Sequence, residues 1–461
     1  MRTPGKVGLK YTLEGVEVRG NTTTLSRVIL SYVSFRGGDV LDVDSRELEL
    51  LRFRLLGTGY FRDVQLSLRK GSRRGLVILV VSVRERNTII LNDVWLGLSA
   101  DADPSGTARP LTAYAGVDAA ETNLLGTGMA LGGAIAFADR QLALRARFSD
   151  PHYLLRVVGI RAEVVYNDAR DFFGNRDVQV DDPSQKTSTD YAIANYRRFG
   201  GLVGVSRDLG TSTQLFFDYR LERLEATLPL AASHVRGKDR EPIDFFIDRG
   251  KSVLSTARMH FAYDTRDEPI LPTRGQQLNA SAETALTPLG GDYPYTKLFV
   301  RGATHHRLSN GHVLRFEATA GAIFGNAPMF EKFYVGDFTD LLPDRVLDLA
   351  FDRRAAPNLL GTAVKEVRYG DLAARATLEY RIPIYRGQKT TYGIDAFGST
   401  GLYAIAENRD VTDPPRGYSG FARFPLDLTL NMGLRIDTSV GGFALGISNV
   451  LGFIPVRSSS Q

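Results

Sequence analysis

The sequence predicts a transmembrane antiparallel β-barrel that is preceded by one small α+β domain. From about residue 90 onward, segments of about 10 residues alternate between apolar and charged positions and are separated by turns, as membrane-spanning strands do. No run of eighteen apolar residues occurs, so the sequence predicts no membrane-spanning helix. Residues 11–88 differ from the rest, because helical and strand spacings follow one another there.

The clearest alternating segment is residues 375–382. A period of two puts Arg375, Thr377, Glu379 and Arg381 on one face and Ala376, Leu378, Tyr380 and Ile382 on the other. The same alternation recurs in residues 142–148, 215–222 and 258–264. A soluble β-sandwich alternates in this way too, and one segment cannot distinguish the two folds. Repetition along the whole chain favours a barrel in lipid.

Composition agrees with this interpretation. The net charge is +5, but acidic and basic residues are interleaved along the strands, which indicates a charged lumen and loops and argues against a nucleic-acid partner. The chain has no cysteine, which is compatible with an oxidising compartment. The first residues are followed by no apolar h-region, so we expect either a mature or trimmed chain or a misassigned start.

The N-terminal domain is predicted over residues 11–88, after an extension of residues 1–10. Residues 12–18 alternate like a strand, and Val28, Ile29, Tyr32 and Val33 form an apolar helical stripe. A second helix follows, with Leu48, Leu51 and Leu55 facing the core, and two strands complete the domain at residues 61–68 and 75–83. The predicted order is β-α-α-β-β.

Two short motifs in this domain resemble those of polypeptide-transport-associated (POTRA) domains. They are Gly20-Asn21 after the first strand, and Gly59-Tyr60-Phe61 before the strand that contains Val64. The resemblance implies binding of unfolded chains by edge-strand addition. It makes Val64, Gln65 and Leu66, or the opposite edge strand, the candidate docking edge. A domain that serves only as a spacer is the alternative.

Three motifs after the domain resemble the outer-membrane protein 85 superfamily, also called the bacterial surface antigen family. They lie in residues 121–128, 148–153 and 263–275, and their key residues are Asn123, Gly126, Gly128, Asp150, Pro151, Asp264, Asp267 and Gly275. The resemblance implies a barrel of about 16 strands over residues 89–461. We count fifteen candidate strands. A dinucleotide-binding loop at Gly126 is improbable because Leu131 stands where the third glycine would be.

A long interruption at about residues 326–369 separates two groups of strands. In the family this loop folds into the lumen, and an arginine of a Val-Arg-Gly-Phe/Tyr motif contacts an aspartate on a later strand. Here the motif is absent, and Ser399 stands where the acid would be. We therefore expect a lost or replaced lumenal lock. The candidate contacts are Arg345, Arg353 and Arg354 on the loop, with Glu379 or Asp395 opposite.

Enzymatic activity is the weakest of the function classes. The six histidines show no His-Glu-x-x-His spacing, and Gly204-Val205-Ser206-Arg207-Asp208 departs from the nucleophile elbow at its last position. Walker-type loops are absent from the sequence. We expect no catalytic residue, no metal site and no cofactor.

The resemblance implies an assembly factor of the bacterial outer membrane that inserts or translocates polypeptides, with the N-terminal domain in the periplasm. Its expected partners are outer-membrane lipid, unfolded outer-membrane or secreted polypeptides, and periplasmic accessory proteins. Trp95 and Gly97 mark the first barrel strand as a candidate weak seam, because glycine has no side chain to pack. The alternatives are an export pore like those of two-partner secretion, and a passive barrel with a vestigial domain.

Overall fold

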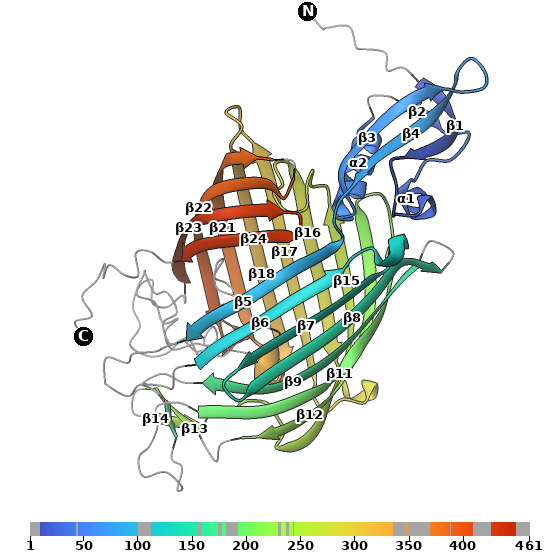
Figure 1. The fold of residues 1–461 in the computed structure, drawn as a ribbon. Helices are drawn as coiled ribbons and strands as arrows, with labels where there is room; N and C mark the ends of the chain where they lie inside the picture. The colour runs from blue at the N-terminus through green and yellow to red at the C-terminus, as the bar shows by residue number, and fades with distance from the viewer. Residues whose placement is uncertain are drawn as a thin grey trace, which may run out of the picture.

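The computed structural model describes most of the chain. The described residues are 10–42, 45–99, 112–154, 158–173, 178–180, 192–228, 232–236, 239–242, 244–334, 347, 369–387, 389–408 and 426–448. They form a small N-terminal domain at one end of a large barrel (Figure 1). We refer to the two ends of the barrel as the domain end and the far end.

The N-terminal domain packs two helices against a four-stranded sheet. Its elements are β1 (Lys10–Arg19), α1 (Ser26–Tyr32), β2 (Val40–Asp42), α2 (Arg46–Gly57), β3 (Phe61–Lys70) and β4 (Leu76–Glu85), and the sheet order is β2-β1-β4-β3. The predicted order β-α-α-β-β therefore omitted one strand. β2 has three residues, too few for a period of two to be recognised.

The predicted helical stripes form the core of this domain. Val28, Ile29 and Tyr32 of α1 are buried, as are Leu51 and Leu55 of α2, whereas the predicted Leu48 is only partly buried. Within the described residues, neither helix has the length and hydrophobicity that a membrane crossing requires.

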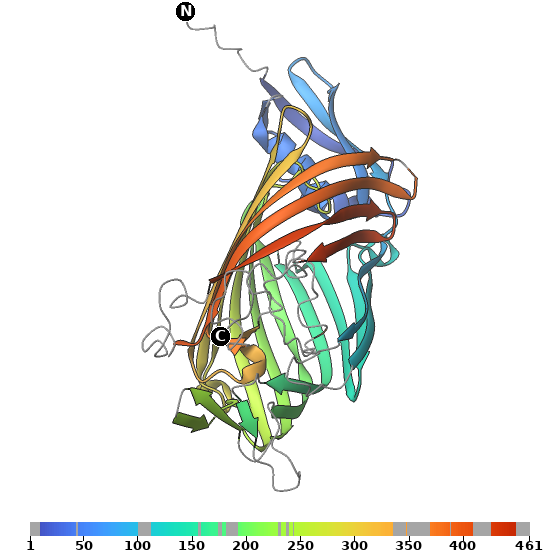
Figure 2. The ribbon, with the colours of Figure 1, turned by 90° about the vertical axis from the view of Figure 1, so that its left-hand side faces the viewer.

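Within the described residues the barrel has fifteen antiparallel strands, in agreement with the fifteen candidates counted in the sequence, and Figures 1 and 2 show their arrangement. In chain order they are β5 (Ile89–Ser99), β6 (Thr112–Glu121), β7 (Ala130–Ala138), β8 (Gln141–Leu154), β9 (Val158–Phe173), β11 (Ala192–Asp208), β12 (Thr213–Thr227), β15 (Gly250–Asp264), β16 (Gly275–Ala285), β17 (Tyr295–Arg307), β18 (Val313–Gly325), β21 (Leu372–Arg386), β22 (Thr391–Ala406), β23 (Leu426–Thr438) and β24 (Gly441–Ser448). The sixteenth strand that the family resemblance implied is not among the described residues.

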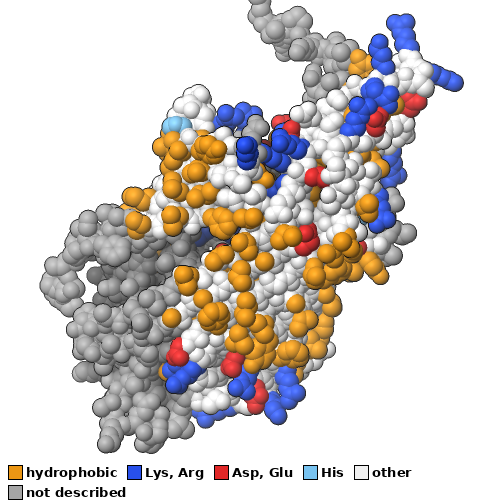
Figure 3. Space-filling model, in the orientation of Figure 1, with side chains coloured by type: hydrophobic (Ala, Val, Ile, Leu, Met, Phe, Trp, Pro, Cys, Tyr) orange, Lys and Arg blue, Asp and Glu red, His pale blue; other side chains and the backbone are white. Residues whose placement is uncertain are grey.

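On β21, whose alternation is the clearest, the charged face points into the barrel. On β21, Glu379 and Arg381 are each 1% exposed, whereas Leu378 is 45% exposed and Ile382 is 41% exposed. A soluble sheet would bury the apolar face instead. Hydrophobic side chains cover the outer wall, and charged side chains gather at the far end and on the N-terminal domain (Figure 3). This distribution matches the apolar band and polar interior of a barrel in a membrane.

Short strands and 3-10 helices lie in the connections between the barrel strands. β10 (Val178–Val180), β13 (Ala232–Arg236) and β14 (Asp239–Pro242) form a separate sheet at the far end (Figure 1). The short 3-10 helices are η1 (Leu124–Gly126), η2 (Thr287–Leu289) and η3 (Met329–Glu331). Downstream of β18, the two-residue strands β19 (Phe333–Tyr334) and β20 (Tyr369–Gly370) pair with each other and close the base of the long interruption.

Candidate functional site

The turn at residues 123–128 attaches the barrel to the N-terminal domain. Asn123 is buried, and its side chain accepts a hydrogen bond from Gly128 N at 2.8 Å and donates one to Thr24 Oγ1 at 2.9 Å. Gly126 has φ +72°, and a Cβ atom there would lie 2.0 Å from Thr23 O. Gly128 O accepts a hydrogen bond from the Tyr60 hydroxyl at 3.0 Å. The glycines of this family motif therefore permit close backbone contact between the two domains.

Glu85, at the end of β4, binds the segment of the N-terminal domain that contacts this barrel turn. Its carboxylate accepts hydrogen bonds from the backbone N–H groups of Thr22, Thr23 and Thr24 at 2.6–3.1 Å, and from the Thr22 hydroxyl. Burial raises the pKa of Glu85, but the hydrogen bonds from Thr22, Thr24 and Thr23 outweigh it and lower the pKa to about 2. The segment that receives the barrel turn is thus fixed by a carboxylate that stays ionised.

Further contacts extend the junction toward neighbouring strands. His152 packs edge-on against Tyr32 with a centroid distance of 4.7 Å, and Arg54 of α2 forms an ion pair with Asp208. Asp150 accepts a hydrogen bond from His152 N at 3.0 Å, while Pro151 packs against Gly159 on β9. Asp150 and Pro151 of the second family motif therefore shape the strand that touches the N-terminal domain.

The first and last barrel strands leave a seam. β5 and β24 stand at opposite ends of the strand order and form no ladder with each other among the described residues. A backbone hydrogen bond of 2.7 Å from Leu91 N to Val440 O joins them at the domain end. In the part of the chain that the structure describes, all neighbouring barrel strands are antiparallel and their number is odd, so β5 and β24 point in the same direction, away from the N-terminal domain. If β5 and β24 paired with each other, the ladder between them would be parallel, unlike every other ladder of the described barrel.

The two seam residues expected from the sequence lie on β5, which has eleven residues. Trp95 is partly buried and packs over Gly116 of β6, and Gly97 pairs with Tyr114. The shorter seam strand is β24, with eight residues. In the described residues, β24 therefore pairs with β23 over fewer residues than β5 pairs with β6.

The turn between β15 and β16 crosses the barrel mouth at the domain end. Asp267 organises it by accepting hydrogen bonds from Thr273 N at 2.8 Å, Thr273 Oγ1 at 2.6 Å and Arg274 N at 3.1 Å. Asp264 pairs with Arg266, and Gly275, with φ +100°, passes within van der Waals contact of Thr265. These residues of the third family motif therefore build a hydrogen-bonded turn.

The tip of that turn reaches strands that are far along the sheet. Ile270 lies against Gly442 of β24, and Leu271 lies against Gly393 of β22. Pro272 O accepts a hydrogen bond from the buried Arg381 of β21. The turn therefore connects one wall of the barrel with the strands next to the seam.

The proposed docking edge of the N-terminal domain is partly occupied. β3 is an edge strand, as edge-strand addition requires, but Val64 is buried and its carbonyl accepts a hydrogen bond from Arg52 Nε at 2.8 Å. Gln65 is exposed and donates to Asp63. Leu66 lines a groove of about 780 Å³ together with Leu68. The groove places the accessible part of this edge at Leu66 and beyond.

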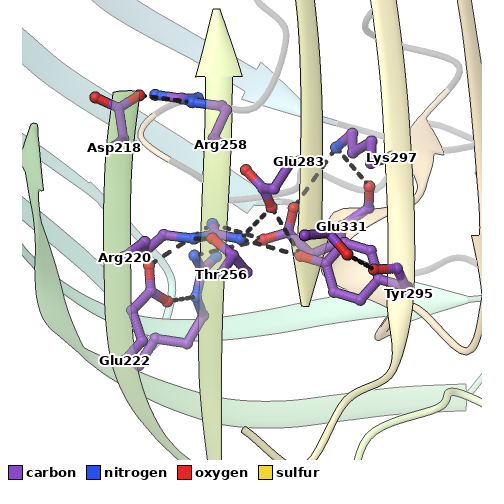
Figure 4. A network of polar contacts seen from close by, with 11 residues as sticks. Asp218, Arg220, Glu222, Thr256, Arg258, Glu283, Tyr295, Lys297 and Glu331 are labelled. Atoms are coloured by element: carbon purple, nitrogen blue, oxygen red, sulfur yellow. Dashed lines mark hydrogen bonds and ion pairs between the residues drawn. The ribbon is translucent and has the colours of Figure 1, made fainter. Parts of the chain in front are cut away.

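A buried ionic network anchors the loop that follows β18 (Figure 4). Glu331 of η3 lies 2.9 Å from Arg220 Nη1 and 3.5 Å from Lys297 Nζ, and Arg198 Nη2 is 4.0 Å away. Arg220 also pairs with Glu283 at 2.8 Å. The loop contributes an acid here and the wall contributes the bases, the reverse of the arginine-on-loop lock that the family resemblance implied.

The lock residues expected from the sequence have different positions. Arg345, Arg353 and Arg354 lie outside the described residues. Glu379 is buried and pairs with Arg435, Arg315 and Arg381, and Asp395 is buried and pairs with Arg386 and Arg381. Both carboxylates thus have partners on the barrel wall.

Sequence reasoning missed Glu331 as an anchor. Its signal was an acid among Met329, Phe330 and Phe333, since an ionised residue in an apolar segment requires a buried partner. Phe330 stacks on Tyr196 with a centroid distance of 5.1 Å, and Arg198 lies 4.5 Å from the Phe330 ring centroid. Aromatic and ionic contacts therefore both attach the segment of residues 329–333 to the barrel wall.

Comparison with protein families agrees with this architecture. Residues 11–86 match the POTRA model, described as a surface antigen variable number repeat, and residues 123–341 match the Omp85 superfamily domain. The chain belongs to the Omp85 superfamily. Its N-terminal domain is a POTRA domain, and the turn that docks on it, residues 123–128, opens the segment that the Omp85 model matches.

One curated relative of this Omp85 chain is the outer membrane protein assembly factor BamA of Nitratidesulfovibrio vulgaris (strain Hildenborough). The two are 28% identical over 338 residues, which cover 71% of this chain and 37% of the relative. The chain thus spans little more than a third of the length of that relative.

Solved structures share the fold of this Omp85 chain. CdiB from Escherichia coli has a TM-score of 0.54 at 12% identity, covering 95% of this chain and 73% of that chain. CdiB from Acinetobacter baumannii has a TM-score of 0.50 at 10% identity, covering 95% and 74%.

Proposed function

We propose that this protein is an assembly factor of the bacterial outer membrane, which inserts polypeptides through the seam between β5 and β24. The observation that carries the proposal is the pair of facing edges that run in the same direction and have no ladder between them in the described residues. Unpaired backbone groups are costly in lipid, and a strand edge is a template for pairing. A client strand antiparallel to both edges would complete an even-numbered sheet.

The POTRA domain would lie in the periplasm and deliver the client. The groove beside Leu66 and Leu68 is lined by apolar side chains and also by Lys70, Arg73 and Arg74, so it offers both kinds of contact to the alternating side chains of an unfolded strand. The domain also lies against the barrel close to the seam, since Asn87 donates a hydrogen bond to Ser439 O at 3.1 Å. The name of the curated relative, an outer membrane protein assembly factor, favours the same activity. We propose no chemical step and no cofactor, and we include periplasmic accessory proteins among the partners.

The absence of cysteine makes a direct test simple. A single cysteine at Gly97 should form a disulfide with a cysteine in the terminal strand of an assembling barrel client, and capture should follow strand register. A second single cysteine, at the exposed outer-wall residue Phe199, should capture none. Failure to capture a client at Gly97, with a secreted polypeptide trapped in the lumen instead, would establish an export pore. Ion conductance with neither kind of capture would indicate a passive barrel.

A further inference from the structure

The outer wall of the barrel changes from apolar to charged near its far end. On β12, the side chains of Phe217, Tyr219 and Leu221 are apolar and exposed on this wall. Arg223 and Glu225 follow on the same face, because every second side chain of a strand points outward. In Figure 3, charged side chains lie at the far end of the hydrophobic band. With the POTRA domain in the periplasm, this border of the band lies in the outer leaflet of the membrane.

Strand register brings three cations together at this border. Glu225 of β12 stands opposite Arg197 of β11 on one side and opposite Lys251 of β15 on the other. Arg223 is two residues from Glu225 on the same face, so Arg197 and Lys251 are its diagonal neighbours. Diagonal neighbours in an antiparallel sheet are about 7–8 Å apart, within reach of long side chains. All four side chains are exposed, and the three cations therefore surround a single acid.

Arg223 is the cation that is free to bind a ligand. Arg197 forms an ion pair with Asp168 of β9 at 3.2 Å. In the part of the chain that the structure describes, the Arg223 guanidinium has no ion pair, hydrogen bond or ring contact. The residues opposite Arg223 are Phe199 and Val253, which are both apolar. A cation beside hydrocarbon is costly unless it reaches water or an anion, so this position favours an anion at the membrane border.

An amphiphile with an anionic head group fits both parts of this surface. Phe199, Val203 and Leu221 are exposed beside Arg223 and on its membrane side, where they would contact acyl chains. A guanidinium donates planar, charge-assisted hydrogen bonds that match the oxygens of a phosphate. A soluble anion would use only the cations, and a neutral lipid would use only the apolar side chains. A phosphorylated lipid uses both.

We infer that Arg223, together with Arg197 and Lys251, binds the phosphate of a lipid in the outer leaflet, whose acyl chains lie on the apolar wall. The inference uses the orientation of the barrel given in the proposed function, but it does not depend on the insertion of clients. The strands that carry the site, β11, β12 and β15, stand in the middle of the strand order. The bound lipid would thus hold in the membrane the part of the wall that is farthest from the seam along the sheet.

The test compares two forms of one lipid. Lipid A, a phosphorylated glycolipid, and the same lipid A after removal of its phosphates are titrated onto the full chain in a nonionic detergent. Native mass spectrometry gives the apparent dissociation constant of the first bound lipid. We expect removal of the phosphates to weaken binding about tenfold or more, since each cation near a lipid surface contributes to the attraction. Equal affinities of the two lipids would overturn the inference without any variant.

Variants then locate the effect. Arg223→Gln should weaken binding of lipid A about fivefold and leave binding of the dephosphorylated lipid unchanged. Glu225→Gln should strengthen binding of lipid A, because it removes the acid between the cations, and damage to the fold would not produce a gain. Arg307→Gln is the matched control, since Arg307 is an exposed arginine at the domain end of β17. No loss in Arg223→Gln, or an equal loss in Arg307→Gln, would exclude the site.

Two further measurements separate this inference from its alternatives. Excess inorganic phosphate should leave lipid A bound, because it lacks acyl chains; displacement by inorganic phosphate would indicate a site for soluble anions and overturn the assignment to lipid. Capture of a client at Gly97 tests the proposed function separately. Failure of capture with the phosphate preference intact would refute only the insertion of clients. Equal affinities for the two lipids with capture intact would refute only the lipid site.

Discussion

Glu331 Oε1 lies 2.9 Å from Arg220 Nη1, and this ion pair joins two residues that are 111 positions apart. Glu331 belongs to the loop after β18, and Arg220 belongs to the wall strand β12. Glu331 is buried and Arg220 is largely buried, so the pair connects the segment that follows β18 to the barrel wall.

Glu331→Gln should therefore destabilise the barrel. The change removes the acid that Arg220 and Lys297 share, but Arg220 keeps Glu283, so we expect a cost of about 1–3 kcal/mol. Urea denaturation of the detergent-folded protein, followed by the fluorescence of the single tryptophan, would measure the loss. Arg301→Gln serves as control, because Arg301 is half-exposed and Glu317 keeps two other arginine partners. An equal effect of both variants would refute an anchoring role for Glu331.

Gly126→Ala should loosen the POTRA domain from the barrel. The residue has φ +72°, and a Cβ atom would overlap Thr23 O, so we expect a cost of about 2–4 kcal/mol at the junction. Hydrogen exchange would measure this loosening as a loss of protection of the backbone amides in residues 20–28. At Gly133 the nearest atom to an added Cβ is 3.7 Å away, so Gly133→Ala should leave the exchange unchanged. Unaltered protection in Gly126→Ala would show that the close contact is not required.

Glu85 should make the same junction sensitive to acid. Its pKa is lowered to about 2 in the folded protein from an ordinary value of 4.5, so its stabilising contribution is complete above pH 4.5 and is lost as the pH falls toward 2. Glu85→Gln should remove about 1–2 kcal/mol at pH 7, less than for a fully buried carboxylate because Glu85 is partly exposed. Protection of residues 22–24, corrected for intrinsic exchange, would be compared between the two proteins from pH 7 to pH 2. A difference between them that does not shrink with acid would contradict this role.

Movement of the β15–β16 turn should accompany opening of the seam, since Ile270 lies against Gly442 of β24. Cysteines at both positions are close enough for a disulfide, and the protein has no other cysteine. Oxidation should slow the assembly of a barrel client in liposomes severalfold, because the last strand can no longer leave the turn. Reduction should restore the assembly rate, and the oxidant should leave the assembly rate of each single-cysteine variant unchanged. Full activity of the oxidised protein would mean that the seam opens without moving this contact.

Local patterns in the sequence predict much of the fold. Alternation with a period of two located all fifteen described strands, since the strand backbone itself sends successive side chains to opposite faces. Residues 375–382 illustrate this, with Glu379 inside and Leu378 outside. The POTRA helices were recognisable for a similar reason, whereas β2, with three residues, was too short to carry a period.

The candidate site depended more on the tertiary structure. Family motifs pointed to Asn123, Gly126 and Asp267, but only the folded chain shows that the first two attach the POTRA domain and the third shapes a turn across the barrel mouth. The capacity of Glu331 to anchor a loop depends on cations from three distant strands. No local pattern reports such a pairing.

The sequence by itself determined the class of the protein: a POTRA domain, strands with one charged and one apolar face, and no thiol. Only the tertiary structure decided that the described edges β5 and β24 run in the same direction, and that Ile270 of the β15–β16 turn lies against Gly442 of β24. The physical reason is that side-chain periodicity follows from the geometry of each strand alone. Closure of the barrel instead depends on the number, length and register of all its strands together.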